Sequence, residues 1–86
     1  MIEVQPCTPE DAVAVSALLG ELGYEVSSRA AAERVQRLNE TGSDPVFIAG
    51  EDGRPLGLIA LHHCHMIQYR SPFVRITALV VHQAAR

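Results

Sequence analysis

The spacing of the apolar residues changes from helical to extended at Gly42-Ser43-Asp44-Pro45, and this change limits the fold more than any other feature. Over most of the stretch before it, apolar residues recur every three or four positions, which is typical of amphipathic helices. After it they form short, β-branched runs, which are typical of strands. Helices followed by several strands predict an α+β fold.

The first half predicts one short strand and two helices. Residues 2–7 alternate in polarity and form a strand whose apolar face carries Ile2, Val4 and Pro6. Thr8-Pro9-Glu10-Asp11 begins a helix over about 9–22, because Thr caps, Pro suits the first turn and acids favour the dipole. Gly23 ends it. A second helix begins at Ser27 or Ser28 and ends near Thr41-Gly42. The apolar residues of these helices are Ala12, Val15, Leu18, Leu19 and Leu22 in the first and Ala31, Val35 and Leu38 in the second.

The second half predicts three strands. Val46–Ala49 and Leu56–Leu61 flank the turn Glu51-Asp52-Gly53-Arg54 and form an antiparallel hairpin. We expect the second of these strands to continue to about Tyr69, where Arg70-Ser71-Pro72 breaks it. Val74–Val81 is β-branched and forms the last strand. The expected order is β-α-α-β-β-β, with a mostly antiparallel sheet.

Composition narrows the class of protein. With 86 residues the chain has room for one domain only, and its net charge is −3 with seven scattered Arg and no Lys. It lacks the basic stripe of a nucleic-acid-binding protein and the run of about 20 apolar residues that crosses a membrane. No signal-peptide pattern opens the chain, so we expect it in the cytoplasm, with Cys7 and Cys64 reduced.

The order of elements, together with Ile76-Thr77-Ala78-Leu79-Val80-Val81-His82-Gln83-Ala84-Ala85-Arg86, resembles the N-terminal part of the GNAT family of N-acetyltransferases. The strand at 1–7 followed by Thr-Pro-Glu-Asp resembles the opening of that family, and Gly50–Gly57 resembles its hairpin. The resemblance implies the acyl-CoA N-acyltransferase fold. It also implies transfer of an acetyl group from acetyl-CoA to a primary amine, by direct attack of the amine on the thioester.

The resemblance also implies a set of cofactor-binding residues. Leu79 matches the position whose main-chain N–H faces the acetyl carbonyl, and Val80 and Val81 lie along the pantetheine and pyrophosphate. Arg86 matches the first residue of the pyrophosphate loop, Arg/Gln-x-x-Gly-x-Gly/Ala. Leu and Val in an apolar strand are also ordinary core residues.

The printed sequence stops at Arg86, where that glycine-rich loop would begin. We therefore expect residues 1–86 to be a single partial GNAT-like domain that lacks the loop and the C-terminal half and does not transfer acetyl on its own. An uncovered sheet edge would favour a homo-oligomer or a swapped dimer. The alternative is a truncated, non-catalytic module for interaction or oligomerisation.

The segment His62-His63-Cys64-His65 supplies candidate catalytic groups. In an extended strand His63 and His65 share one face and His62 and Cys64 the other. In an acetyltransferase a neutral imidazole of His62, His63 or His65 can accept the proton of the amine, and His63 and His65 are our catalytic candidates. Two of these histidines could also begin a zinc site with His82 or an acid, but we expect no metal. Some family members carry a glutamate base on the fourth strand, where this chain has Arg75.

Overall fold

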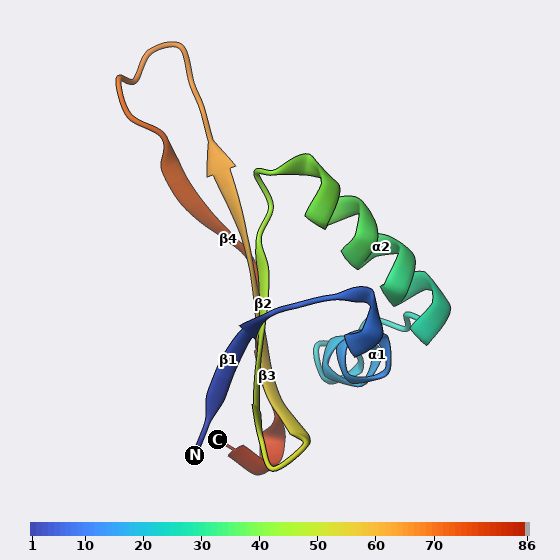
Figure 1. The fold of residues 1–86 in the computed structure, drawn as a ribbon. Helices are drawn as coiled ribbons and strands as arrows, with labels where there is room; N and C mark the ends of the chain where they lie inside the picture. Colours follow the sequence, from blue (N-terminus) through green and yellow to red (C-terminus); the bar gives the residue numbers. More distant parts are fainter. Residues whose placement is uncertain (86) are drawn as a thin grey trace.

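The computed structural model describes residues 1–85 and shows two helices packed on one side of a four-stranded antiparallel sheet (Figure 1). The strands follow one another in space in the order β1-β2-β3-β4. This arrangement confirms the predicted fold class and order of elements. The elements are β1 Glu3–Pro6, η1 Pro9–Asp11 (a 3-10 turn), α1 Ala12–Glu21, α2 Ser28–Thr41, β2 Val46–Glu51, β3 Arg54–Cys64, β4 Phe73–Val81 and η2 Gln83–Ala85.

Helix α2 begins and ends where the local chemistry predicts, whereas the first helix, predicted over about 9–22, is divided into the 3-10 turn Pro9–Asp11 and α1 Ala12–Glu21. The Thr8 N–H donates to the Asp11 carboxylate at 2.9 Å, which closes a capping box ahead of α1. At the start of α2 the Ser27 hydroxyl accepts the Ala30 N–H at 3.1 Å. Gly42 ends α2 with φ 74°, a left-handed conformation in which glycine carries no steric cost.

The core lies between the helices and the sheet. Leu18 of α1 and Ala31 of α2 are fully buried, and they belong to the two predicted apolar stripes. Leu22 differs, because α1 ends at Glu21 and the side chain of the next residue is 41% exposed. The buried residues are Cys7, Ala12, Val15, Leu18, Ala31, Val35, Val46, Leu58 and Val80.

Two expectations about strands are wrong. The predicted apolar face of the first strand is exposed, because β1 is an edge strand and the helices cover the opposite face of the sheet. The third strand ends at Cys64 and does not reach Tyr69. Beyond it the Tyr69 N–H donates to the Met66 carbonyl at 3.0 Å, which makes a turn within the connection to β4.

The β3–β4 ladder contains one irregularity that affects the candidate site. Ala60 pairs with Ala78 and Leu61 pairs with Ile76, so Thr77 has no residue directly opposite. The Thr77 hydroxyl donates to the Ala60 carbonyl at 3.1 Å instead. An extra residue of this kind is a β-bulge, which bends a strand and increases its twist.

Within residues 1–85 no helix is long and apolar enough to cross a membrane.

Candidate functional site

The main chain of Leu79 faces the open edge of β4. The His82 N–H donates to the Leu56 carbonyl at 2.6 Å, and the Val80 carbonyl lies 3.0 Å from the point where a Cβ on Gly57 would be. Both groups therefore face β3. Because alternate residues of a strand direct their main-chain groups to the same side, the N–H of Leu79 points away from β3. Among the described strands nothing pairs with that side of β4.

The side chains of this segment alternate between the two faces of the sheet. Val80 packs into the core and is 3% exposed, whereas Leu79 is 55% exposed on the face without helices. The main-chain groups of Val81 lie on the same side of β4 as those of Leu79, by the same alternation. The cofactor contacts expected of these three residues stay predictions. Arg86, the fourth expected contact, lies outside the described residues.

The residues that follow β4 are hydrogen-bonded to the end of α1. The Gln83 N–H donates to both oxygens of the Glu21 carboxylate, at 3.3 and 3.2 Å. The Ala84 N–H donates to Nδ1 of His82 at 3.0 Å, so Nε2 of that ring carries its proton, 3.8 Å from Glu21 Oε1. The Gln83 N–H that follows β4 is thus already paired with a carboxylate.

His62 has the most specific polar environment of the histidine-rich segment. Its Nδ1 lies 2.6 Å from Oδ1 of Asp44. The other oxygen of Asp44 accepts the Thr41 hydroxyl at 2.7 Å and the Ser43 hydroxyl at 3.0 Å. Hydrogen bonds from Thr41, His62 and Ser43 hold the pKa of Asp44 below its ordinary value.

The two histidines selected from the sequence lie in different settings. His63 pairs with Val74, and its N–H donates to the Ser43 carbonyl at 2.8 Å. His65 is exposed and follows the last residue of β3. The strand alternation that was expected to put the two on one face therefore does not extend to His65. Their catalytic roles stay predictions.

Sequence reasoning missed Asp44. It belongs to the stretch Gly42-Ser43-Asp44-Pro45, which predicts a loop, and it lies 18 positions before His62. The antiparallel pairing of β2 with β3 brings the two together, because Val46 at the start of β2 pairs with Ala60. The polar cluster Thr41, Ser43 and Asp44 just before a strand was the available signal.

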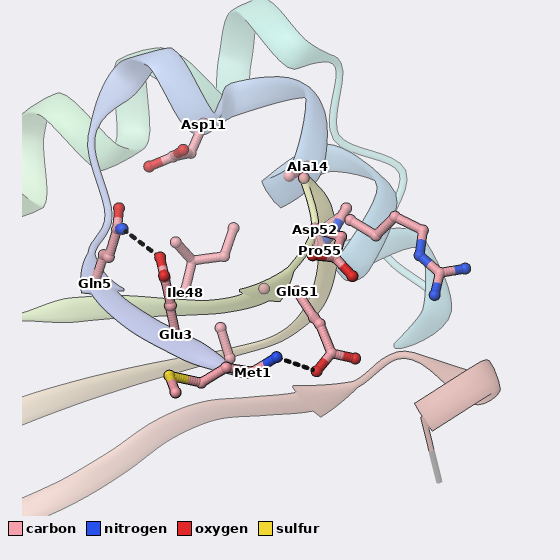
Figure 2. Close-up of a pocket in the computed structure, with 13 residues that line it drawn as sticks. Met1, Glu3, Gln5, Asp11, Ala14, Ile48, Glu51, Asp52 and Pro55 are labelled. Carbon is pink, nitrogen blue, oxygen red and sulfur yellow. Dashed lines mark hydrogen bonds and ion pairs between the residues drawn. The ribbon is translucent and has the colours of Figure 1, made fainter.

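A separate hollow of about 490 Å³ lies between β1, η1 and the β2–β3 turn (Figure 2). It is lined by the acidic side chains of Glu3, Asp11, Glu51 and Asp52 together with Arg54. The amino group of Met1 lies 3.0 Å from Glu51 Oε2 and neutralises part of this charge. None of the predicted site residues lines it, so it is not part of the candidate site. Across residues 1–85, no three His, Cys, Asp or Glu side chains are grouped to hold a metal ion.

Comparisons with known proteins bear on the fold. No family model and no curated protein matches the sequence. Among solved structures, a GNAT family acetyltransferase from Staphylococcus aureus is 17% identical, with a TM-score of 0.88 over 99% of this chain and 65% of that chain. A ribosomal-protein-alanine N-acetyltransferase from Brucella melitensis is 15% identical, with a TM-score of 0.74 over 100% of this chain and 60% of that one. An aminoglycoside acetyltransferase from an uncultured soil sample is 21% identical, with a TM-score of 0.74 over 100% of this chain and 61% of that one.

The chain thus spans 60–65% of the length of these structures. It has the fold of the GNAT acetyltransferases, over the part of that fold that corresponds to its N-terminal half.

Proposed function

We propose that residues 1–86 form the N-terminal part of an acetyltransferase that moves an acetyl group from acetyl-CoA to a primary amine. The observation that carries the proposal is the N–H of Leu79, which faces the open edge of β4 beside the bulge at Thr77. Acyl transfer develops negative charge on the carbonyl oxygen, and a fixed main-chain N–H is the donor that stabilises it. The likeness of fold to three acetyltransferases supports the same reaction class.

Acetyl-CoA supplies the activated thioester when it is bound. In the proposal its acetyl carbonyl meets the N–H of Leu79, and its pantetheine arm follows β4 past Val80 and Val81. The Gln83 N–H already pairs with Glu21, so the residues that bind the pyrophosphate are proposed to lie from Arg86 onward. This supports the expectation that residues 1–86 are one partial domain that lacks the glycine-rich loop.

The acceptor is proposed to be a primary amine whose carrier is left open. The structural neighbours are named for a ribosomal-protein alanine and for aminoglycosides, which are chemically unlike each other. His63 and His65 stay candidates for accepting the proton of the amine. We also propose that the protein acts in the cytoplasm, because both cysteines are free thiols.

The test replaces Leu79 in the full-length protein that carries these residues. Leu79→Pro removes the N–H that faces the open edge but no hydrogen bond of the β3–β4 ladder, and proline is tolerated on edge strands. Leu79→Ala keeps the N–H and is the matched control. Release of CoA thiol is followed with a peptide that begins with alanine and with an aminoglycoside as acceptors. The proline variant should lose roughly 10²–10³-fold in rate, as for other oxyanion donors.

Three results would count against the proposal. They are equal rates for the proline and alanine variants, an equal loss in both, or no thiol release by the unaltered protein with any amine. Circular dichroism of the proline variant checks that the sheet is retained, so that a loss of rate reports on the missing N–H.

A second candidate function is supported by the bare face of the sheet. Val4, Ile76 and Leu79 are exposed there, and Ile76 and Leu79 lie on β4, which has an open edge. A module that pairs with itself, as a homo-oligomer or a swapped dimer, would cover both the bare face and the open edge of β4. Two measurements on the full-length protein separate this function from catalysis: sedimentation for the oligomeric state and calorimetry for acetyl-CoA binding. A stable dimer that binds no acetyl-CoA would favour the interaction module.

A further inference from the structure

The last residue of α1, Glu21, contacts the chain just after β4. Both oxygens of its carboxylate accept the Gln83 N–H, at 3.3 and 3.2 Å, and Nε2 of His82 lies 3.8 Å from Oε1. Glu21 and Gln83 are 62 positions apart in the sequence. The Glu21 side chain is 22% exposed, so most of it is withdrawn from water where the helix meets the strand. The acetyl transfer described so far gives Glu21 no role of its own.

The position of Glu21 is unfavourable for the helix that carries it. The C-terminal end of a helix has a partial negative charge from its unpaired carbonyl groups, and it repels a carboxylate. Helix α1 has no acidic residue in its first turn and no basic residue in its last turn, so its charges do not follow the helix dipole. A residue that breaks a local rule in this way is expected to serve a contact elsewhere in the molecule.

The Gln83 N–H continues the row of main-chain groups along the open edge of β4. The N–H of Leu79 faces away from β3, as described above. Further along the chain, the His82 N–H still donates to the Leu56 carbonyl of β3 at 2.6 Å. The alternation of the strand therefore turns the N–H of the next residue, Gln83, to the side of Leu79. An N–H on that side needs a partner outside the sheet, and the Glu21 carboxylate supplies it.

The same contact fixes the point at which the chain leaves the sheet. The Ala84 N–H donates to Nδ1 of His82 at 3.0 Å, so side-chain acceptors hold the main chain at both Gln83 and Ala84. The arm of acetyl-CoA between the thioester and the phosphates is uncharged, whereas the phosphates are negative and a carboxylate repels them. The phosphates are therefore excluded from Gln83 and bind residues that follow it. The direction in which those residues follow depends on how residues 82–84 are held.

We propose that Glu21 is a positioning residue for acetyl-CoA; this rests on the proposed function. Its carboxylate holds the Gln83 N–H, so that the chain leaves β4 in one direction. The edge at Leu79 and the pyrophosphate-binding residues proposed from Arg86 onward then keep a fixed separation, which one acetyl-CoA molecule spans. Holding a site in its bound conformation raises affinity, because less freedom is lost on binding. Glu21 takes no part in proton transfer or bond formation, so it acts on cofactor binding and not on the chemical step.

The first test measures the contact itself and needs no bound cofactor. Amide hydrogen exchange, followed by NMR on ¹⁵N-labelled residues 1–86, should be slow at Gln83 and fast at Leu79. Glu21→Ala should speed the exchange at Gln83 roughly tenfold, because a hydrogen bond to a charged group is lost. Unchanged exchange at Val80 checks that the sheet is retained. Glu21→Gln keeps an acceptor oxygen and should keep most of the protection. Equal exchange rates at Gln83 and Leu79 in the unaltered chain would overturn the proposal.

The second test measures cofactor binding in the full-length protein. Glu21→Ala should raise the KM for acetyl-CoA, and its dissociation constant in calorimetry, by roughly tenfold. It should leave kcat and the KM for the amine unchanged. Glu21→Gln should restore most of the affinity, and because Gln and Ala are both uncharged, this rescue would show that the acceptor oxygen is what matters. Glu33→Ala is the matched control, since it removes an exposed acid from α2 that pairs only with Arg29. It should change none of these values.

The outcomes separate the two proposals. An unchanged affinity for acetyl-CoA in Glu21→Ala, or a loss confined to kcat, would overturn the role of Glu21 while acetyl transfer stands. Absence of both transfer and acetyl-CoA binding in the unaltered protein would remove the proposed function and the positioning role together.

Discussion

The two faces of the sheet carry similar apolar side chains and have opposite surroundings. Leu58 and Leu79 lie on neighbouring strands, yet Leu58 is 5% exposed under the helices and Leu79 is 55% exposed on the bare face. Val80 and Val81 differ in the same way, at 3% and 41%. Strand alternation assigns residues to a face, but only the packing of α1 and α2 makes one of the faces a core. Apolar residues on the face covered by the helices should therefore stabilise the fold, whereas similar residues on the bare face should contact other molecules.

The sharpest test of this comparison exchanges the same residue type on each face. Leu58→Ala should lower the free energy of unfolding by about 2–5 kcal/mol, because it opens a cavity in the core. Leu79→Ala should change it by no more than about 0.5 kcal/mol, as surface substitutions do. Urea titrations followed by circular dichroism measure both. Equal losses would mean that the bare face is covered in solution.

The bare face should tolerate added side chains only where the β3–β4 ladder leaves room for them. A Cβ at Gly57 would meet the Val80 carbonyl at 3.0 Å and the Val81 Cα at 3.7 Å, and backbone atoms cannot move aside cheaply. Gly57→Ala should cost about 1–3 kcal/mol, as in other overpacked sites. Gly20→Ala, in α1 with nothing within 4 Å, should stabilise by up to about 1 kcal/mol. Thermal melts of the two variants should shift in opposite directions, and a shared direction would contradict the account.

The buried thiol of Cys7 should make the stability of the chain depend on pH. Burial, with the charge and hydrogen bond of Asp11, raises the pKa of Cys7 from 9.0 to about 11. As the pH rises the unfolded chain therefore loses this proton first. The stability that the neutral thiol contributes is complete below pH 9 and is lost between about 9 and 11.

Urea titrations at pH 8 and pH 10 should show this loss, and Cys7→Ala should abolish it. In the folded chain at pH 8, iodoacetamide should modify Cys64, which is only partly buried, well before Cys7. Equal alkylation rates would show that Cys7 is not enclosed.

The smallest expected effect concerns self-association through the bare face. Ile76 is 58% exposed there, and a serine at this position removes apolar surface without touching the core. Ile76→Ser should weaken self-association a few-fold in sedimentation equilibrium, since contacts of this kind depend on apolar area. Val13→Ser on the exposed side of α1, where Val13 is 75% exposed, is the control and should leave it unchanged. A monomer at every concentration before mutation would exclude this use of the face.

Local chemistry made much of the fold predictable. The capping box at Thr8 and Asp11, the cap at Ser27 and the left-handed Gly42 each act over a few residues, and each marks a boundary in the sequence that the structure has too. The β2–β3 turn at Asp52-Gly53 is of the same kind, since both residues adopt positive φ.

Features that depend on distant residues were not predictable from the sequence. The end of β3 at Cys64 was missed because Met66, Ile67 and Tyr69 continue its apolar character, although all three are exposed. The contact of His62 with Asp44 depends on the pairing of β2 with β3. The exposed face of β1 depends on which side the helices pack. The sequence resemblance placed Leu79 correctly on the last strand, but the open edge beside it came only from the sheet order.

The most direct measurement is an NMR titration of ¹⁵N-labelled residues 1–86 with acetyl-pantetheine, which carries the acetyl thioester without the pyrophosphate. The account predicts that the amide signal of Leu79 shifts with the ligand while that of Val80, whose N–H faces β3, shifts far less. A titration in which Leu79 stays unmoved, or in which the two neighbouring amides shift alike, would contradict the placement of the acetyl group at the open edge of β4.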